Sequence, residues 1–338
     1  MKKRLFTAVS AIMALSCVLG SVACTGNVNP EELTVYMPDG APALALAQMM
    51  KEDTDKDSFV YRVVAASAIA SKVTYEDMDK NADFCVMPVT AASKLLGKGD
   101  KYTMLGVVTH GNLYIVSKSE TKLDESNLSS LVGKNMGVLN INEVPGMTLK
   151  TVLNKHGVAW SVVGNDGTVS ASNVNLTAIS GADAVGTVEG AEYYLLAEPA
   201  ASAQSKKGYS IVGDVQALYG GENGYPQAVL VAKNSVIASR EKDVKEFVEK
   251  LSKNATYLQT ATGAELVETV SAHMEDPNQA TSLKAPLLTA DVLGRCGVYF
   301  TYAADSSAEV HSYLQGVLEI NEKATAIPAE KFFWTYQK

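Results

Sequence analysis

The sequence carries one pattern twice. Residues 83–93 consist of a short apolar run, a proline and a run of small residues, and residues 193–202 repeat that order. Pro88 and Pro199 take the same place in the two copies and lie 111 positions apart. Because proline stops a buried strand and the small residues after it can begin a helix, each copy predicts a strand-to-helix corner. Two such corners predict two similar α/β lobes around a cleft that closes on a small molecule.

The repeat also predicts how the chain divides. We expect residues 32–110 and 227–338 to form a first lobe with C-terminal helices, and residues 111–226 to form the second. Glycine-containing breaks interrupt a strand pattern at two equivalent places, residues 110–112 and 220–226. Such paired breaks are typical of a two-segment hinge, because a hinge absorbs its backbone rotation at a few residues. A length of 338 residues is enough for one or two domains.

The N-terminus predicts export. Three basic residues at positions 2–4, an apolar run at 5–19 and small residues up to Ala23 are typical of a signal peptide over 1–23, and the run is short for a membrane span. Cys24 and the polar residues after it resemble the bacterial lipobox, which implies lipidation at Cys24, a tether over 24–31 and anchoring to the outer face of the cell membrane. Ordinary cleavage after Ala23 is the alternative.

Charge excludes some partners. Removing the signal peptide takes three positive charges away and changes the formal net charge from −8 to −11. An acidic chain of this kind is a poor ligand for nucleic acid or for anionic lipid. Beyond Cys24, only Cys85 and Cys296 remain, and we expect inert thiols rather than a disulfide.

Two corners are the first candidates for a ligand site. Asp39, Gly40 and Ala41 follow a predicted strand and precede a predicted helix over 43–51, and Gly146, Met147 and Thr148 take the equivalent place in the second lobe. Glycine lets a ligand approach the backbone, and free N–H groups at a helix start favour a carboxylate, sulfonate or carbonyl oxygen. The alternative is that these glycines only permit tight turns.

Further candidates lie at neighbouring corners and in the breaks. Ser67, Thr90 and Thr148 carry hydroxyls that suit ligand binding or helix capping equally well. Glu198 follows a buried strand, where it either accepts a hydrogen bond from the ligand or pairs with Arg295 or a lysine. The predicted contacts are completed by residues in the breaks, namely His110, Asn112 and the aromatic Tyr225.

Five segments together resemble one protein family. They are residues 38–44, 105–117, 198–200, 224–231 and 327–333. They are similar to ABC-transporter solute-binding lipoproteins of the nitrate/sulfonate/taurine and thiamine-pyrimidine-precursor class. The resemblance implies a type II periplasmic-binding fold, an α/β fold of two lobes. Each lobe would be a mostly parallel five-stranded sheet flanked by helices, and the lobes would exchange one strand across two hinge segments.

The resemblance also implies a function. The chain would be an exported monomer that captures a small sulfonate-like or pyrimidine-like solute and delivers it to a membrane permease with its cytoplasmic ATPase. We expect no cofactor and no catalytic residue, and the four histidines show no metal-binding spacing. Two alternatives stay open. They are an enzyme, if His110 and Glu198 meet in the cleft, and a sensor or adhesin built on the same two-lobed fold.

Overall fold

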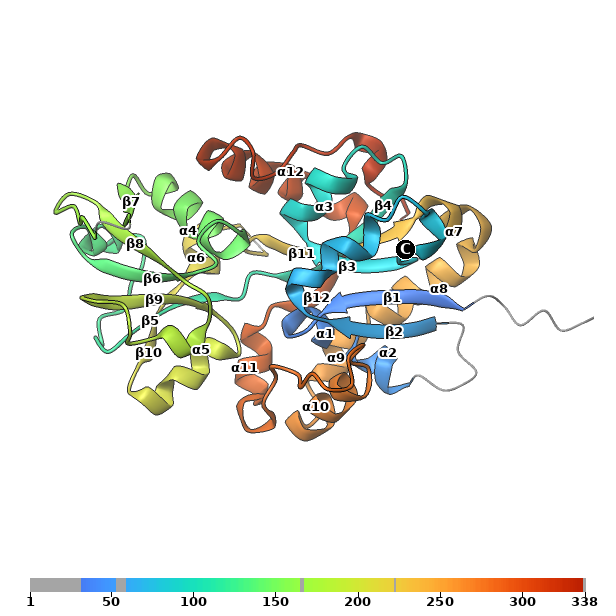
Figure 1. Cartoon of the computed structure of the whole chain (residues 1–338), viewed down its shortest axis with the longest axis horizontal. Coiled ribbons are helices and arrows are strands. Elements are labelled where there is room, and N and C mark those ends of the chain that lie inside the picture. The colour runs from blue at the N-terminus through green and yellow to red at the C-terminus, as the bar shows by residue number, and fades with distance from the viewer. Residues whose placement is uncertain (1–31, 53–58, 165–166, 222, 337–338) are drawn as a thin grey trace, which may run out of the picture.

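A computed structural model describes residues 32–52, 59–164, 167–221 and 223–336. These residues form two lobes, each built on a six-stranded sheet with helices packed around it (Figure 1). The predicted signal peptide, the predicted tether and Cys24 lie outside the described residues.

The first sheet combines strands from distant parts of the chain. Its members are β1 (Leu33–Pro38), β2 (Phe59–Val64), β3 (Phe84–Pro88), β4 (Tyr102–His110), β11 (Pro226–Lys233) and β12 (Val298–Tyr302). They lie in the order β12-β4-β11-β3-β1-β2. β1 pairs in parallel with β2 and β3, whereas β11 runs antiparallel to β3 and β4. The central strands are buried almost throughout, as expected for a sheet that is covered on both faces.

The second sheet has the same plan. Its members are β5 (Leu113–Ser117), β6 (Asn135–Leu139), β7 (Trp160–Val162), β8 (Val174–Ile179), β9 (Ala191–Ala197) and β10 (Ser210–Asp214). They lie in the order β10-β5-β9-β6-β8-β7. β6 pairs in parallel with β8 and β9, whereas β5 runs antiparallel to β9 and β10.

The two sheets exchange a strand, as the resemblance implied. β5 follows β4 along the chain but joins the second sheet, and β11 follows β10 but joins the first. Each exchanged strand runs antiparallel to its two neighbours. Without the edge strands β12 and β7, each sheet has five strands, and the four that are not exchanged run in one direction. The α/β fold is confirmed, but each sheet has six strands rather than five because β12 and β7 extend one edge of each.

Helices cover both sheets. Around the first sheet are α1 (Ala41–Leu44), α2 (Ala47–Lys51), α3 (Val89–Leu96), α7 (Asn234–Ser239), α8 (Glu241–Leu251), α9 (Asn254–Leu258), α10 (Gly263–Ala272), α11 (Ala290–Arg295) and α12 (Ala303–Ile320). Around the second are α4 (Val144–Lys155), α5 (Ala200–Ala203) and α6 (Val215–Tyr219). Short 3₁₀ helices occupy Ala66–Val73, Met78–Lys80, Leu128–Leu131, Ala182–Ala184, Gln204–Lys207, Ala285–Leu287 and Glu330–Phe332.

The chain crosses between the lobes twice, at residues 110–112 (the first crossing) and at residues 220–226 (the second crossing). Beside these crossings the lobes share a core. One apolar cluster runs from β3 and β4 through α12 into α4 and β6. Inside it the rings of Tyr225 and Tyr313 stack with centroids 5.7 Å apart. Gly316 of α12 lets that helix approach Thr151 of α4 closely, since an added Cβ would lie 2.9 Å from the threonine Cγ2. The lobes therefore meet along α12 and α4 as well as at the covalent crossings.

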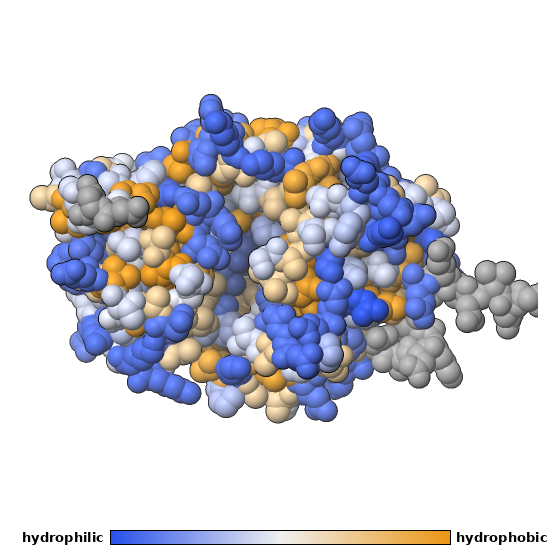
Figure 2. Space-filling model, viewed as in Figure 1, coloured by the Kyte–Doolittle hydropathy of each residue, from blue (hydrophilic) through white to orange (hydrophobic). Residues whose placement is uncertain are grey.

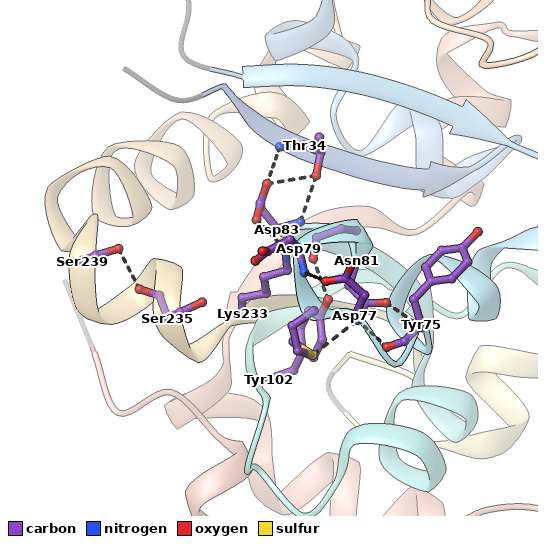
Figure 3. Close-up of polar contacts among 12 residues, drawn as sticks. Thr34, Tyr75, Asp77, Asp79, Asn81, Asp83, Tyr102, Lys233, Ser235 and Ser239 are labelled. Carbon is purple, nitrogen blue, oxygen red and sulfur yellow. Dashed lines mark hydrogen bonds and ion pairs between the residues drawn. The ribbon is translucent and has the colours of Figure 1, made fainter. Parts of the chain in front are cut away.

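A polar cluster fastens the first sheet at its other end (Figure 3). The carboxylate of Asp83, just before β3, accepts hydrogen bonds from the backbone N–H of Thr34 at 2.9 Å and from the Thr34 hydroxyl at 3.0 Å. Its second oxygen accepts a 2.9 Å bond from the ammonium group of Lys233 at the end of β11. One carboxylate, whose side chain is 16% exposed, therefore links the ends of β1, β3 and β11, at the edge opposite the corners predicted to bind ligand.

Candidate functional site

The exchanged strands determine which ends of the strands in one sheet face the other sheet. The chain leaves the first sheet at the carboxyl end of β4 and enters the second as β5, whose first residue, Leu113, pairs with Ala197 at the carboxyl end of β9. The carboxyl ends of β1, β3 and β4 therefore face those of β6, β8 and β9. Between them the surface is hollowed and lined with hydrophilic residues (Figure 2). Open α/β sheets bind ligands at such edges.

On the first lobe, the corner after β1 is held by a distant segment. The Asp39 carboxylate accepts a hydrogen bond from the hydroxyl of Thr281 and another, at 2.6 Å, from the backbone N–H of Ser282. Gly40 has a φ of 98°, which glycine adopts freely and other residues rarely do. The helix that begins at Ala41 has only four residues. A helix this short has a weak dipole. A ligand at this corner would therefore bind to individual backbone groups rather than to the helix dipole.

The other first-lobe candidates lie beside this corner. Ser67 is exposed in the 3₁₀ helix after β2, with its side chain outside the core. Thr90 is half-buried in the first turn of α3, and its carbonyl oxygen accepts a 3.0 Å hydrogen bond from the hydroxyl of Thr325. The structure thus places Asp39, Ser67 and Thr90 at the ends of neighbouring strands. Their contact with a ligand stays a prediction.

On the second lobe, the corner before α4 is tightly packed. A Cβ on Gly146 would lie 2.1 Å from the carbonyl oxygen of Ile141, so the turn itself requires glycine. Met147 is buried, and the buried Thr148 hydroxyl donates to the carbonyl of Val144 at 2.7 Å and lies 2.8 Å from the Tyr313 hydroxyl. The tight-turn alternative therefore describes Gly146, and Thr148 joins α4 to α12. Ligand contacts by these three residues stay a prediction.

The first crossing carries buried polar groups. The His110 ring, 1% exposed, stacks on Tyr299 with centroids 3.9 Å apart, and its Nε2 lies 2.6 Å from the Thr301 hydroxyl. Among the described residues, Nδ1 of His110 and Oδ1 of Asn112 have no hydrogen-bond partner. Tyr225, fully buried, packs its ring against Gly111. Because buried polar atoms are normally satisfied, two orphaned atoms at one crossing mark a place where a ligand can supply the partner.

Burial also determines the charge of His110. Desolvation lowers the pKa of its imidazole from 6.5 to about 4, so the ring is neutral at pH 7. Histidine in the unfolded chain takes up its proton near pH 6.5. Between these two values the unfolded state binds more protons, and the free energy of unfolding therefore falls as the pH drops.

We expect His110 to make the protein sensitive to acid. Its contribution to the free energy of unfolding should fall by about 3 kcal/mol in total as the pH drops from 6.5 to 4. Urea unfolding of the wild type and of His110→Gln at half-unit pH steps measures this, because glutamine does not titrate. The difference between the two should shrink towards acid pH, and parallel profiles would show that folding does not lower the pKa of His110.

Glu198 has a definite partner. Its Oε1 accepts hydrogen bonds from Nε of Arg295 at 2.7 Å and from the hydroxyl of Ser202 at 2.6 Å, and its Oε2 accepts one from the Ser202 backbone N–H at 3.0 Å. Nη2 of Arg295 also donates to the Ser202 hydroxyl at 2.8 Å. The structure thus shows the pairing with Arg295 that the sequence left open.

The pairings of Asp39 and Glu198 show what sequence reasoning missed. Thr281 and Ser282 hold Asp39, and Ser202 holds Glu198, yet none of the three was a candidate. Ser202 lies four residues after Glu198, a spacing that brings it onto the same side of the short turn and is visible in the sequence. No local pattern could indicate Thr281, which lies 242 positions from its partner Asp39.

A second hollow lies beside Tyr225, whose chain neighbours Gly224 and Pro226 line it. It has a volume of about 820 Å³ and is bordered by α4, by α12 and by the second crossing. Its walls are the sides of helices and include Lys155, Tyr219 and Glu309, whereas none of the predicted contacts lines it. The orphaned atoms of His110 and Asn112 lie at the facing strand ends and not among the residues that line this hollow.

Two further features of the described residues bear on the site. No set of three or more histidine, cysteine, aspartate and glutamate side chains comes together in a way that could hold a metal ion. None of the helices in this part of the chain combines the length and the apolar composition that crossing a membrane requires.

Solved structures share this fold. An ABC transporter from Parabacteroides distasonis has a TM-score of 0.69 at 19% identity, over 91% of this chain and 100% of that one. The periplasmic aliphatic sulphonate binding protein SsuA from Escherichia coli has a TM-score of 0.62 at 14% identity, over 90% and 92%. The alkanesulfonate-binding protein SsuA from Xanthomonas axonopodis pv. citri, bound to MOPS, has a TM-score of 0.55 at 13% identity, over 89% and 95%.

The family assignment comes from the sequence. No curated protein matches the chain. The model of the NMT1/THI5-like family matches residues 71–262, which cover both crossings, the second lobe and more than half of the chain. This match confirms the class that the five sequence segments resembled. The chain belongs to the NMT1/THI5-like family.

Proposed function

We propose that the protein is the extracytoplasmic solute-binding component of an ABC importer. It captures a small organic solute between its lobes and delivers the solute to a membrane permease that is driven by a cytoplasmic ATPase. The observation that carries this proposal is the meeting of strand carboxyl ends from both sheets around a crossing with orphaned buried polar atoms. Family membership and the shared fold support it.

The polar groups around the crossing favour one kind of solute. The imidazole of His110 is neutral at pH 7, and the charge of Arg295 is paired with Glu198. A multiply charged anion would therefore find no free cation among the residues described at this crossing. A molecule with one anionic or amide end and an N–H or O–H donor suits the acceptor of Asn112 better. Sulfonate-like and pyrimidine-like solutes meet this description, and two of the proteins with this fold are named for binding sulfonates.

The same proposal covers location and partners. The protein is exported and held at the outer face of the membrane by a lipid on Cys24, and it acts as a monomer. The enzyme alternative required His110 and Glu198 to meet. Among the described residues, however, the bonds of the Glu198 carboxylate go to Arg295 and Ser202, and none joins it to His110. We therefore propose a binding protein rather than an enzyme.

Thermal-shift screening tests the proposal. The panel holds alkanesulfonates, taurine, aminopyrimidines and amino-acid amides. At a concentration 100 times its Kd, a true solute stabilises the folded protein by about 2.7 kcal/mol and raises the Tm. A panel in which no compound raises the Tm would argue against this solute class.

Calorimetry then locates the site. Asn112→Ala should weaken binding of the identified compound about tenfold, the loss expected for one hydrogen bond of about 1.4 kcal/mol. The Tm should change little, because Oδ1 of Asn112 has no protein partner to lose. Asn321→Ala, an exposed asparagine after α12, is the matched control. Wild-type affinity in Asn112→Ala would place the solute elsewhere.

A further inference from the structure

The contact between Arg295 and Glu198 joins the two lobes. Arg295 ends α11, which is anchored in the first lobe by Val292 and Leu293 in the core around β1. Glu198 follows β9, and Ser202 lies in α5, in the second lobe. Figure 1 shows α11 beside α5, although the two helices belong to different lobes. Two hydrogen bonds, one of which is also an ion pair, thus depend on both lobes keeping this arrangement.

A second contact reinforces the first. The Tyr114 hydroxyl of β5 donates to the carbonyl oxygen of Arg295 at 3.4 Å, so the second lobe contacts both the backbone and the side chain of this residue. The Glu198 side chain is 0% exposed, whereas that of Arg295 is 35% exposed. In this arrangement the carboxylate is therefore shut away from water, and Arg295 at the end of α11 supplies its charged partner.

The energetics of this pair change with the distance between the lobes. A buried carboxylate is stable only when charged and hydrogen-bonded partners replace its water. If the lobes separate, Arg295 leaves, water reaches Glu198, and the Ser202 bonds alone remain because they lie within one lobe. In the closed arrangement the two charges of Arg295 and Glu198 attract each other, and in the open arrangement water solvates both. Because these two effects offset each other, the pair shifts the equilibrium between open and closed arrangements moderately and does not lock the protein closed.

We propose that Glu198, Ser202 and Arg295 form an interlobe latch that sets how much of the ligand-free protein is closed. Arg295 is then a positioning residue for solute binding. In the closed arrangement Glu198 is bonded to Arg295, and this bond fixes the distance between the two corners before any solute arrives. This step rests on the proposed function only where it concerns affinity, because closure itself is a property of the ligand-free chain.

The effect on affinity follows from populations. A solute that binds only the closed arrangement has an apparent Kd equal to its intrinsic Kd divided by the closed fraction. A variant with one tenth of the wild-type closed fraction would therefore bind about tenfold more weakly without losing any direct contact.

Distance measurements on the ligand-free protein test the latch. Nitroxide labels on Lys206→Cys beside α5 and Gln279→Cys beyond α10 lie at exposed positions in opposite lobes. The full chain also carries Cys17→Ser and Cys24→Ser, and the remaining cysteines, Cys85 and Cys296, are buried. Pulsed electron paramagnetic resonance then gives the distribution of interlobe distances without any solute.

Four variants give the comparison. Arg295→Met keeps an unbranched stem but removes the charge, and it should move the distribution to longer distances. Arg295→Lys restores the charge with fewer donors, so its distribution should lie between that of Arg295→Met and the wild type. Lys134→Met removes an exposed ion pair with Glu192 inside the second lobe and should change nothing. Glu198→Gln with Arg295→Met removes both charges, leaves none buried and unpaired, and should also open the protein.

The outcomes separate clearly. Opening in Arg295→Met and in the double variant, with partial recovery in Arg295→Lys, supports the latch. Wild-type distances in the folded double variant would overturn it, even if Arg295→Met alone fails to fold. Failure to find a solute leaves these distances unaffected, so the latch and the proposed function stand or fall separately. Once a solute is known, its affinity should fall in proportion to the closed fraction.

Discussion

Alanine in place of Gly297 is expected to lower the free energy of unfolding by about 4 kcal/mol or more, a loss that few single substitutions reach. Gly297 leads into β12 with a φ of 62°, a region that costs a residue with a Cβ about 1–2 kcal/mol. An added methyl group would also lie 1.9 Å from the carbonyl oxygen of His110 and 2.6 Å from that of Gly111. Neither obstacle can rotate away, because both belong to the backbone of the first crossing.

The damage should spread from this point. The carbonyl of Gly297 accepts the 2.8 Å hydrogen bond from the His110 N–H that begins the contact between β12 and β4. Urea unfolding measures the loss. Gly294→Ala is the matched control, since a methyl group there meets nothing within 4 Å in a helix that alanine favours. Equal stability of the two variants would contradict the packing of the crossing.

The second large effect is expected at Asp83. Replacing Asp83 by alanine should cost about 3–5 kcal/mol, the range measured when one partner of a buried ion pair is removed. Lys233 would then keep a buried ammonium group without its carboxylate, and the backbone N–H of Thr34 would lose its acceptor. Solute affinity should stay unchanged, because Asp83 precedes β3 and Lys233 ends the antiparallel β11, at the opposite end of these strands from the crossings.

Two comparisons isolate the cause of this loss. Asp100→Ala removes an ion pair with Lys331 in which both side chains are largely exposed, and little change in urea stability is expected there. Asp83→Asn combined with Lys233→Met removes both charges together, so it should recover a large part of the lost stability. An Asp83→Ala protein as stable as Asp100→Ala would show that the buried pair contributes nothing.

Local patterns were sufficient for the strand-to-helix corners. Pro88 ends β3 and Pro199 follows β9, and each precedes a helix, as the repeat predicted. These elements depend on apolar runs and proline, whose effects act within a few residues.

Other elements depend on partners that are distant in the sequence. The helix predicted over residues 43–51 is broken in two, and the buried Asn254 explains the break. Its side chain accepts from the N–H of Gln48 and donates to the carbonyl of Leu44, each at 2.9 Å, in place of the helical bond between those two groups. The strand β12, by contrast, was missed although its aromatic and β-branched residues are typical of a strand.

The candidate site shows the same division. Sequence reasoning placed Asp39, Glu198 and His110 at the ends of strands, and the structure has them there. Each has a hydrogen-bond partner far away in the sequence, at residues 281, 295 and 301, between 97 and 242 positions away. Which polar atoms are occupied and which remain free is decided by those distant partners, so it could not be predicted from local patterns.

The exchange of strands constrains the order in which a chain made from its N-terminus can fold. β3 and β4 are synthesised early, but β11, which lies between them in the sheet, begins only at Pro226, and β12 ends at Tyr302. We expect the first lobe to remain incomplete on the ribosome until the whole second lobe has been made. Pairing across so many residues is slow. A chain destined for export, as proposed here, would therefore reach the translocation machinery before it can fold.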